Sequence, residues 1–380
     1  PGRIAQVWRM TRVFTAVILV FLLGSAAVVR GGREPDAFDL VKARTVDLLH
    51  GGSSTGPQRM AVTKRSDAWC SDWLNAGHGP VEEMAGDPIG TTERARDRSR
   101  DVRGLAFAFS DPNSEWYESR ALVETVSIAL NDLLDLYGSS AAREGNWHTW
   151  LIAIPDNLLA VGLLMEDELD PTLLDRLIAV MAGRLERMVL TGANASWEAR
   201  NHIYLALLTG DPARLAEAAR RVSVDVRYGS VSGVREDYAY LFHGQIPYAG
   251  VYGAGFAQTV AQFVYLFSGT PWAIPETKVD LVANLLLEHT RWFVVGDRID
   301  RSVVGRAYEA RRSSRPILEA MLYLARTDSG RSSEMARAAR ALIEDGAVVD
   351  EAVASWADEV MASGIEAERP VGFRYWPSAE

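Results

Sequence analysis

The 380-residue sequence has almost no cysteine and no surplus of positive charge, and each shortage excludes a class of protein. Cys70 is the only cysteine, so an intramolecular disulfide and a metal site built on two thiolates are both excluded. The net charge of −10 argues against non-specific binding to nucleic acid, because phosphates attract a basic surface. We therefore expect no nucleic-acid partner, and we interpret Cys70 as a buried structural thiol.

The bulk composition is that of a folded globular protein. Hydrophobic residues make up 48% and charged residues 24% of the sequence, a balance that disordered chains do not have. The length allows one large domain or two ordinary ones, with ample material for a core. Because the chain is acidic overall, an anionic ligand would need a locally basic cleft.

The N-terminal region predicts an export signal. A short basic region at residues 10–12 precedes the apolar run 13–23, and small residues follow it, which is typical of a secretory signal peptide. The run is shorter than the roughly 20 residues that span a bilayer, so an uncleaved membrane anchor is the weaker alternative. We therefore expect an upstream extension at residues 1–9, a signal peptide at 10–27, and a secreted, extracellular protein without stable membrane association.

Apolar residues recur at three- and four-residue spacing along most of the chain, a pattern that predicts amphipathic helices. The expected helices cover residues 36–49, 119–137, 147–165, 171–190, 197–208, 212–222, 256–267, 275–294, 315–326, 332–345 and 350–361. Asp170 and Asp211 each precede a proline and predict helix N-caps, whereas Gly192 and Gly210 predict helix ends. Residues 52–100 lack this periodicity, so we expect a long irregular connection with short helices there.

Strand signals are sparse, and the best of them, at residues 225–231, is weak. About ten helices of moderate length joined by short loops predict a layered all-α architecture. Two concentric rings of antiparallel helices, an α/α toroid, would accommodate them. A helical repeat solenoid is the alternative, but the sequence has no fixed repeat period.

A cluster of chemically useful side chains lies between two expected helices, at residues 235–255. It contains four tyrosines, among them Tyr248 and Tyr252, together with His243 and several glycines. Loops that carry aromatic and titratable side chains on a rigid scaffold commonly bind ligands or catalyse reactions. The alternative is that these tyrosines only pack the loop against the domain.

Two further segments carry aromatic or basic side chains. Trp147, His148 and Trp150 lie close together, and an exposed tryptophan can stack on the apolar face of a sugar ring. Because Trp147 and Trp150 are three residues apart, they would equally suit a helix face buried in the core. Residues 300–312 contain four arginines, which form either a basic patch suited to carboxylates or an ordinary solvated surface.

The order of several short phrases is more informative than any phrase alone. Asn194, for example, would ordinarily be a helix N-cap. In chain order the sequence has Asn146-Trp-His-Thr-Trp-Leu-Ile-Ala-Ile-Pro155, Thr191-Gly-Ala-Asn194, Phe242-His243 to Tyr252-Gly253, and Gly305-Arg306-Ala-Tyr308. These phrases, and the nine-residue interval from His243 to Tyr252, resemble the polysaccharide lyase family of hyaluronate, chondroitin AC and xanthan lyases.

The resemblance implies a catalytic group of four residues. Asn194 and His243 are expected to bind the carboxylate of a uronic acid, and Tyr252 to act as base, acid or both. Arg306 is expected near this tyrosine, where its charge would favour the phenolate. Donors at the carboxylate would stabilise a carbanion more than the ground state, so the implied reaction is eliminative cleavage without a metal or an organic cofactor.

The resemblance also implies residues that hold the polysaccharide, and Trp147 resembles part of an aromatic patch. The expected substrate-binding residues are Trp147, His148, Trp150, Tyr248, Tyr308 and Arg311. The sequence departs from the family where His148 replaces a tryptophan, Leu151 a glutamate and Ala195 an arginine. The pair Arg306 and Tyr308 is closer to xanthan lyase than to hyaluronate lyases, so the identity of the glycan stays open.

Family members continue past the helical domain into a β-sandwich that contributes an acidic residue to the catalytic site. Here residues 36–365 are expected to form an incomplete α/α toroid that carries the catalytic residues, and residues 366–380 resemble the start of a truncated sandwich. We therefore expect either a fragment or a truncated relative. We expect it to be a monomer whose partner is an acidic polysaccharide.

Two other functions stay open. A hydrolase would need paired carboxylates, and Glu236 with Asp237 is a poor pair because adjacent side chains on a strand point in opposite directions. A non-catalytic glycan-binding protein, or an inactive lyase fragment, is the stronger alternative.

Overall fold

In a computed structural model, the described residues are 36–51, 55–77, 88–138, 145–229, 232–309, 312–349 and 353–370. The expected signal peptide at 10–27 and the upstream residues 1–9 lie outside them, as does Arg311. Of the expected start of a sandwich, only residues 366–370 are described, and these have no regular secondary structure.

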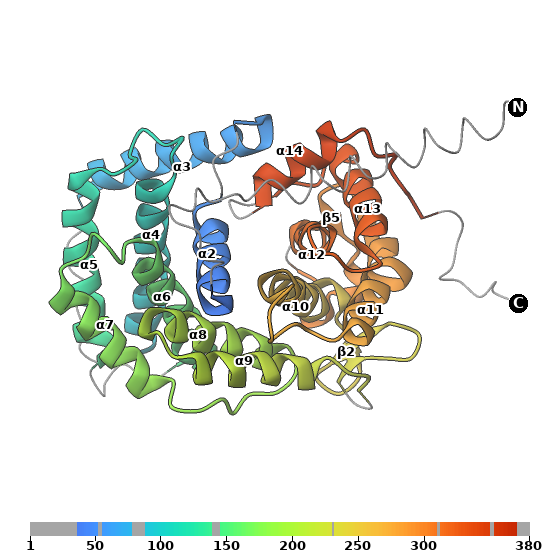
Figure 1. Ribbon diagram of the computed structural model, residues 1–380, viewed down its shortest axis with the longest axis horizontal. Helices are drawn as coiled ribbons and strands as arrows, with labels where there is room; N and C mark the ends of the chain where they lie inside the picture. The colour runs from blue at the N-terminus through green and yellow to red at the C-terminus, as the bar shows by residue number, and fades with distance from the viewer. Residues whose placement is uncertain are drawn as a thin grey trace, which may run out of the picture.

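Thirteen α-helices make up most of the described chain and confirm the all-α prediction. An inner row consists of α4 (Pro88–Ser110), α6 (Ile154–Leu164), α8 (Ala193–Thr209), α10 (Ala254–Phe267) and α12 (Arg315–Ala325). The outer helices are α5 (Arg120–Gly138), α7 (Pro171–Arg184), α9 (Pro212–Asp225), α11 (Glu276–Asn284) and α13 (Ser332–Glu344). Helix α2 (Ala37–His50) lies between α4 and α10, whereas α3 (Pro57–Ala76) and α14 (Ala354–Ala362) run along one edge (Figure 1). The arrangement is the expected α/α toroid.

Helices α8 and α10, which are neighbours in the inner row, run parallel to each other. Trp197 of α8 packs against Gly255 of α10. Seven residues further along each helix, Tyr204 hydrogen-bonds to Gln262. Because both contacts advance in the same direction, the N-termini of α8 and α10 lie at the same end of the toroid. The partial positive charges of the two helix N-termini therefore meet there and favour an anion.

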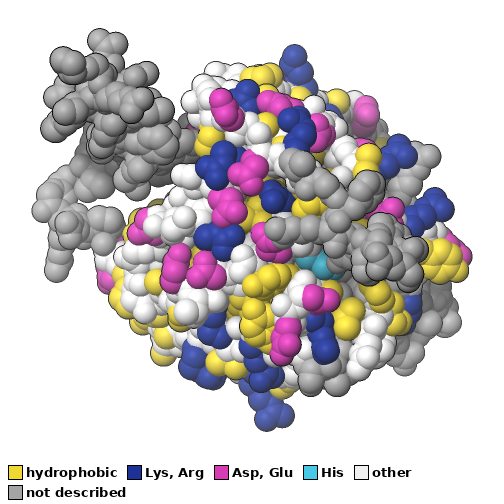
Figure 2. All heavy atoms as spheres, turned by 90° about the vertical axis from the view of Figure 1, so that its right-hand side faces the viewer, with side chains coloured by type: hydrophobic (Ala, Val, Ile, Leu, Met, Phe, Trp, Pro, Cys, Tyr) yellow, Lys and Arg dark blue, Asp and Glu magenta, His cyan; other side chains and the backbone are white. Residues whose placement is uncertain are grey.

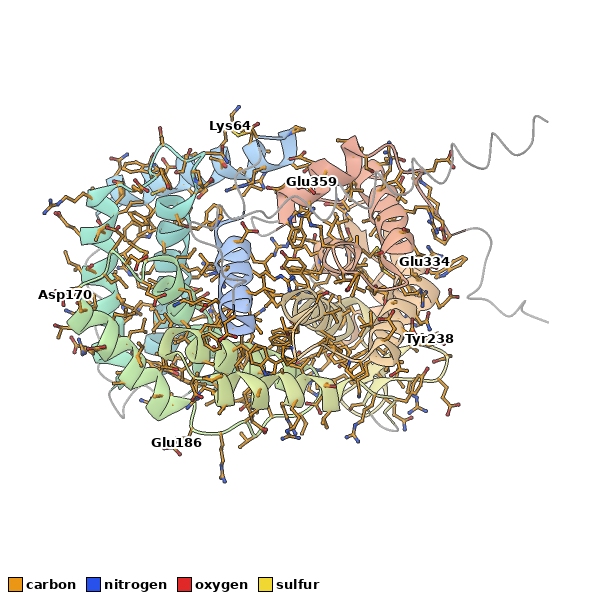
Figure 3. The ribbon with its side chains drawn as sticks, viewed as in Figure 1. Lys64, Asp170, Glu186, Tyr238, Glu334 and Glu359 are labelled. Carbon is orange, nitrogen blue, oxygen red and sulfur yellow. The ribbon has the colours of Figure 1, made fainter. Side chains whose placement is uncertain are left out.

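Helix α2 fills the middle of the toroid and holds the C-terminus of α10. The Nη1 of Arg44 donates hydrogen bonds to the backbone oxygens of Tyr265 (3.3 Å), Leu266 (3.1 Å) and Ser268 (2.6 Å). The last carbonyls of a helix lack the usual N–H partner of the next turn, so the arginine supplies donors to the end of α10, in addition to the Ser268 N–H that bonds to the Tyr265 oxygen (3.3 Å). Figure 3 shows side chains crowded between α2, α10 and α12, whereas the labelled Asp170 extends at the periphery.

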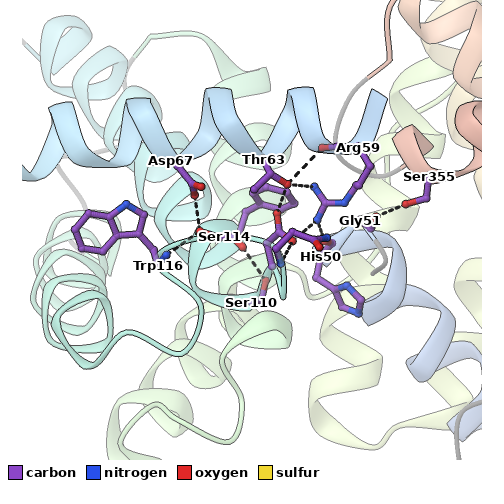
Figure 4. Close-up of polar contacts among 12 residues, drawn as sticks. His50, Gly51, Arg59, Thr63, Asp67, Ser110, Ser114, Trp116 and Ser355 are labelled. Atoms are coloured by element: carbon purple, nitrogen blue, oxygen red, sulfur yellow. Dashed lines mark hydrogen bonds and ion pairs between the residues drawn. The ribbon is translucent and has the colours of Figure 1, made fainter. Parts of the chain in front are cut away.

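A buried ion pair connects α3 with the C-terminal end of α4 (Figure 4). The guanidinium of Arg59 lies 2.6 Å from Asp111, and both side chains are fully buried. Thr63 accepts a hydrogen bond from Arg59 (3.0 Å) and donates one to Asp111 (2.8 Å), while Arg59 also donates to the backbone oxygen of His50 (3.0 Å). Polar side chains therefore join α2, α3 and the end of α4 without contact with solvent.

Helix α14 supplies the N-terminal cap of α3, although the two are about 300 residues apart in sequence. Gly56 occupies the N-cap position of α3 and has no side chain to contribute. The carboxylate of Asp358 instead accepts hydrogen bonds from the backbone N–H groups of Gln58 (3.0 Å) and Arg59 (3.1 Å). This contact links the first and last parts of the described toroid.

We expect Asp358→Ala to lower the free energy of unfolding by about 1 kcal/mol, the ordinary value of a helix cap. Asp358→Asn retains an acceptor for the same N–H groups and should restore most of this loss. Urea unfolding followed by circular dichroism would measure both variants. Equal stability of Asp358→Ala and the unchanged protein would contradict the capping role.

The sequence prediction for residues 52–100 was wrong, because α3 and the first half of α4 lie there. Helix α3 buries Arg59 and Thr63 along with Val62, Cys70 and Trp73, so its inward face is partly polar. A helix whose polar residues are paired inside the protein lacks the apolar stripe that predicts a helix. Cys70 is buried as expected, and burial, followed by Asp67 and Glu115, raises the pKa of its thiol to about 12.

Of the strand predicted at residues 225–231, the described residues contain only an isolated bridge, in which Tyr228 pairs with Val234. Asp225 ends α9, and a three-stranded antiparallel sheet follows later in the sequence. Its strands are β1 (Gly233–Val234), β2 (Tyr240–Phe242) and β3 (Ile246–Pro247), and a separate pair consists of β4 (Val294–Val295) and β5 (Arg298–Ile299). The strands are too short to show the alternation of apolar and polar residues that sequence patterns detect.

Most helix boundaries follow the predicted signals. Asp170 accepts a hydrogen bond from the Thr172 N–H (2.8 Å), and Asp211 caps α9 in the same way. Gly210 ends α8 in the left-handed conformation (φ 62°). Gly192 is different: it is the N-cap of α8 and not a helix end, because α7 already stops at Arg184.

The surface carries charges of both signs. On the face that includes α13, acidic and basic side chains lie side by side (Figure 2). Ion pairs of the protein include Arg337–Glu368 and Arg369–Asp345, each at 2.9 Å. None of the helices in the described ranges combines the length and the hydrophobicity that a bilayer span requires.

Candidate active site

His243 lies in a tight turn between two strands. It follows β2 directly, and the register pairs Phe242 with Ile246, so residues 243–245 form the turn of the hairpin. His243, Gly244 and Gln245 all have positive φ angles, at 47°, 79° and 74°. Positive φ is unfavourable for a histidine or a glutamine, and such strain concentrates at functional sites. The turn leaves the imidazole exposed beside the N-terminus of α10.

Tyr252 lies in a short π-helix (Ala249–Gly253) that leads into α10. Its hydroxyl is 3.3 Å from the Nε2 of His243. The ring of Phe242 stacks on the Tyr252 ring, with 4.3 Å between centroids, and also contacts the His243 ring edge-on at 4.7 Å. Phe242 therefore fixes the relative positions of the two reactive side chains.

Arg306 completes the group from a loop before α12. Its Nη2 lies 2.9 Å from the Nε2 of His243, and its guanidinium also hydrogen-bonds to the Tyr252 hydroxyl. The hydrogen bond to Tyr248, followed by interaction with the Tyr248 and Tyr252 hydroxyls, raises the pKa of Arg306. The structure thus brings the three predicted catalytic residues His243, Tyr252 and Arg306 into contact.

The buried Tyr248 holds Arg306 in place by hydrogen bonds. Its hydroxyl accepts hydrogen bonds from the backbone N–H of Arg306 (2.8 Å) and from its Nε (3.1 Å). The preceding Gly305 has φ 55°, and a Cβ there would lie 2.2 Å from the Tyr248 ring. Only glycine allows this approach. Tyr248 was predicted to bind substrate, but it is 2% exposed, so the structure gives it a positioning role.

The contacts define which imidazole nitrogen carries the proton. A guanidinium only donates hydrogen bonds, so the Nε2 of His243 must be the acceptor in its contact with Arg306. The neutral ring then has its proton on Nδ1, which has no hydrogen-bond partner among the described residues. Nδ1–H is thus a donor available to a ligand.

Burial, and then the positive charge of Arg306, lowers the pKa of His243 from its ordinary value of 6.5. We expect the imidazole to stay neutral as the pH falls through 6.5 and to become protonated only at lower pH. Arg306→Gln removes the repelling charge and should move the midpoint upward. Titration of the His243 ring by proton NMR would measure both midpoints, and a midpoint above 6.5 in the unchanged protein would contradict the proximity of Arg306.

Asn194 lies in the first turn of α8 without capping it, because Gly192 is the N-cap. Its side chain has no hydrogen-bond partner in the described chain, so its amide is available to a ligand. Asn194 is one helical turn before Trp197, and the Trp197 ring packs 6.0 Å from that of Tyr252. The fourth predicted catalytic residue therefore lies at the same end of the toroid.

Aromatic rings continue away from Tyr252 in a row. The Trp197 ring contacts His148 edge-on at 5.6 Å, and His148 contacts Trp147 at 6.0 Å. Trp147 is 47% exposed and lies at the outer end. We call Trp147, His148, Trp197 and Tyr252 the aromatic row. The sequence reasoning missed Trp197, whose position three residues after Asn194 was the available signal.

The aromatic row does not include the other described residues that were predicted to bind substrate. Trp150 is only 6% exposed and stacks on Tyr137 with 5.4 Å between centroids, as the core alternative expected. Tyr308 is 57% exposed, two residues after Arg306. Arg311 lies outside the described residues. Among the residues that the structure describes, no cluster of histidine, cysteine, aspartate or glutamate could hold a metal ion.

Comparison with known proteins places this geometry in a family. Residues 92–341 match the family described as polysaccharide lyase family 8, N terminal alpha-helical domain. The sequence is 26% identical over 279 residues to xanthan lyase of Bacillus sp. (strain GL1), and the aligned region covers 69% of this chain and 30% of that protein. It is 25% identical over 311 residues to hyaluronate lyase of Thermasporomyces composti, and this aligned region covers 78% of this chain and 40% of that protein. The chain thus spans less than half the length of these relatives.

Solved structures share the fold. The Paenibacillus xanthan lyase superimposes with a TM-score of 0.76 at 17% identity, over 88% of this chain and 34% of that one. The Streptomyces coelicolor A3 chondroitin AC lyase, solved in complex with chondroitin sulphate, gives a TM-score of 0.75 at 20% identity, over 88% and 50%. Because the family match covers well over half of the sequence, the chain belongs to polysaccharide lyase family 8, of which it contains the N-terminal α-helical domain.

Proposed function

We propose that this chain provides the catalytic helical domain of a lyase that cleaves a uronate-containing polysaccharide of the hyaluronan, chondroitin or xanthan type by β-elimination. The observation that carries the proposal is the contact of Tyr252, His243 and Arg306 at one end of the toroid. A phenol, an imidazole and a guanidinium in mutual contact can move a proton and stabilise a carboxylate.

The proposed reaction starts at C5 of the uronate. Tyr252, as a phenolate beside the Arg306 guanidinium, takes the C5 proton. Negative charge then builds up on the carboxylate, where the Asn194 amide and the Nδ1–H of His243 donate hydrogen bonds. These bonds strengthen as the charge develops, so they stabilise the transition state more than the bound substrate.

The second half of the reaction breaks the chain. The electron pair left at C5 forms the C4–C5 double bond while the bond from C4 to the glycosidic oxygen breaks. Tyr252 returns its proton to that oxygen and is again a phenolate. No water is consumed. One product carries a new reducing end, and the other carries an unsaturated uronate at its non-reducing end.

The aromatic row supports binding of the polysaccharide next to the reacting residue. Sugar rings stack on indole faces through their apolar C–H groups. Trp197 adjoins Tyr252, and Trp147 is exposed at the outer end, so successive sugars would lie along the row. We also propose that the protein is secreted, since an extracellular polysaccharide does not enter cells; the N-terminal export signal supports this.

The assay for the proposed function uses hyaluronan, chondroitin and xanthan as substrates. The 380-residue chain, and a longer product including any adjoining coding sequence, are incubated with each glycan. Ultraviolet absorbance then detects the unsaturated uronate. Absence of this product from every glycan and both proteins would overturn the proposal.

We expect Tyr248→Phe to reduce kcat at least tenfold with little change in KM. The phenyl ring preserves the packing against Gly305, but Arg306 loses a hydroxyl acceptor that is worth about 1.5–3 kcal/mol for a charged group. Steady-state kinetics separates kcat from KM, and circular dichroism checks folding. A rise in KM alone would instead indicate that Tyr248 binds substrate, as the sequence predicted.

The second candidate is a glycan-binding protein without turnover. Its motive is that the chain covers only 30–40% of the length of two catalytic relatives. Binding that persists in Tyr252→Phe, with no product from the unchanged chain, would support it. A hydrolase is less well supported, since Glu236 and Asp237 are exposed neighbours in one turn and do not face each other across a cleft.

A further inference from the structure

The interior of the toroid contains a polar cavity of about 530 Å³ that the proposed reaction does not use. It is lined by α2 and by every helix of the inner row. Cavities that hold small ligands commonly measure about 300–1,000 Å³. Its polar lining includes Arg100, Arg103, Arg200, Arg315, Gln258 and Gln262. We call this space the lumen cavity.

Positive charge dominates the side chains that line the lumen cavity. Among its described lining residues there are four arginines and one carboxylate, that of Glu319. Outside the lining, the buried Asp156 is shared between two of these arginines: its oxygens lie 2.9 Å from Arg103 and 2.6 Å from Arg200. A single carboxylate therefore serves two guanidinium groups.

Arg200 is the central basic group of the cavity. Burial opposes its charge, but Asp156 and nearby tyrosines outweigh burial and raise its pKa, so the guanidinium stays charged. Only its Nε is engaged by Asp156. Its two terminal nitrogens have no hydrogen-bond partner in the described part of the chain. The side chain is 22% exposed, so a ligand could reach these nitrogens. Two charged donors thus border the cavity.

The lumen cavity lies directly behind the aromatic row. Arg200 is one helical turn after Trp197 on α8, and Gln258 is one turn after Gly255, against which Trp197 packs. The charge of Arg200 acts on His148 of the aromatic row. Burial lowers the pKa of His148 most, the positive charge of Arg200 lowers it further, and the negative charge of Asp156 opposes the shift. The cavity is therefore separate from the group around Tyr252 but adjacent to it.

We propose that the lumen cavity is a second binding site, for one carboxylate- or sulfate-bearing sugar, with Arg200 as its principal anion-binding residue. Arg200 and Arg100 would hold the anionic group, since arginine pairs with oxyanions in bidentate geometry. Gln258, Gln262 and Tyr204 line the cavity with neutral polar groups. Gln258 donates to Glu319, and Tyr204 bonds to Gln262, so a sugar hydroxyl would use the remaining donors and acceptors of these side chains. The inference rests on the proposed function only for the choice of an acidic sugar.

The test separates the two sites by mutation. The His243→Ala variant, in which the candidate active site is disabled, is titrated with glucuronate by isothermal calorimetry. We expect saturable binding at millimolar concentration, and at least a tenfold rise in Kd when Arg200→Gln is added. Arg100→Gln, at a 70% exposed side chain, should weaken binding without affecting folding. Arg120→Gln on α5, at a 93% exposed side chain remote from the cavity, is the matched control.

Three results would overturn the proposal. These are no binding to the folded His243→Ala variant, equal affinity in the Arg200→Gln and Arg120→Gln backgrounds, and sulfate binding as tight as that of glucuronate, which would leave no role for the sugar. Glucose, the neutral analogue, should not bind. The readout is binding and not product, so failure of the lyase assay and failure of the second site are distinguishable.

Discussion

We expect Tyr252→Phe to reduce product formation by about 10³-fold while binding of the glycan stays within a factor of about three. The substitution removes one oxygen and keeps the ring that stacks on Phe242 and packs against Trp197. Loss of a general acid or base costs typically 10²–10⁴ in rate. Because this hydroxyl serves both proton transfers in the proposed reaction, we expect a loss near the middle of that range and not at its lower end.

The matched control is Tyr228→Phe. This tyrosine is 52% exposed and lies outside the group around His243, so its loss should leave the rate unchanged. Initial rates by ultraviolet absorbance and binding by calorimetry would be measured on both variants. A Tyr252→Phe variant that retains more than about a tenth of the rate would exclude the tyrosine as the essential acid and base.

Asp111→Ala is expected to have the largest effect on stability, a loss of about 3–5 kcal/mol in the free energy of unfolding. Removal of the carboxylate leaves the buried Arg59 guanidinium without its counter-charge, and Thr63 loses an acceptor. The penalty comes from desolvated charge that nothing neutralises. A marginally stable domain could lose much of its folded population.

The double variant Arg59→Met with Asp111→Leu tests this explanation. If uncompensated charge is the cause, removal of both charges should recover most of the stability, because an apolar pair of similar volume can replace a buried ion pair. Arg120→Ala, which breaks the exposed pair with Glu124, should change the free energy by less than about 1 kcal/mol. Denaturant unfolding of all three would contradict the account if the double variant were no more stable than Asp111→Ala.

The fold was predictable where helices bury an apolar stripe and follow clear caps. Helices α7 and α9 are examples, since Asp170 and Asp211 cap them and both bury a regular apolar stripe. Helix α3 was not, because Arg59 and Thr63 on its inward face find partners that lie far away in sequence. Likewise, no local pattern shows that Asp358 caps α3.

The candidate site was predictable to the extent that its residues have a characteristic order in the chain. His243, Tyr252 and Arg306 meet as expected. The individual tasks were harder to assign, because burial decides them: Tyr248 supports Arg306 from inside, and Trp150 belongs to the core. Sequence spacing does not distinguish an exposed aromatic ring from a buried one.

The measurement that tests the central claim most directly is mass spectrometry of the products formed in water enriched in ¹⁸O. Elimination consumes no water, so we predict an unsaturated uronate fragment lighter by one water than a hydrolysis product. Neither fragment should carry ¹⁸O when the products are reduced with borohydride at once, which stops exchange of the anomeric oxygen with water. Saturated fragments that carry ¹⁸O would show hydrolysis and contradict the account.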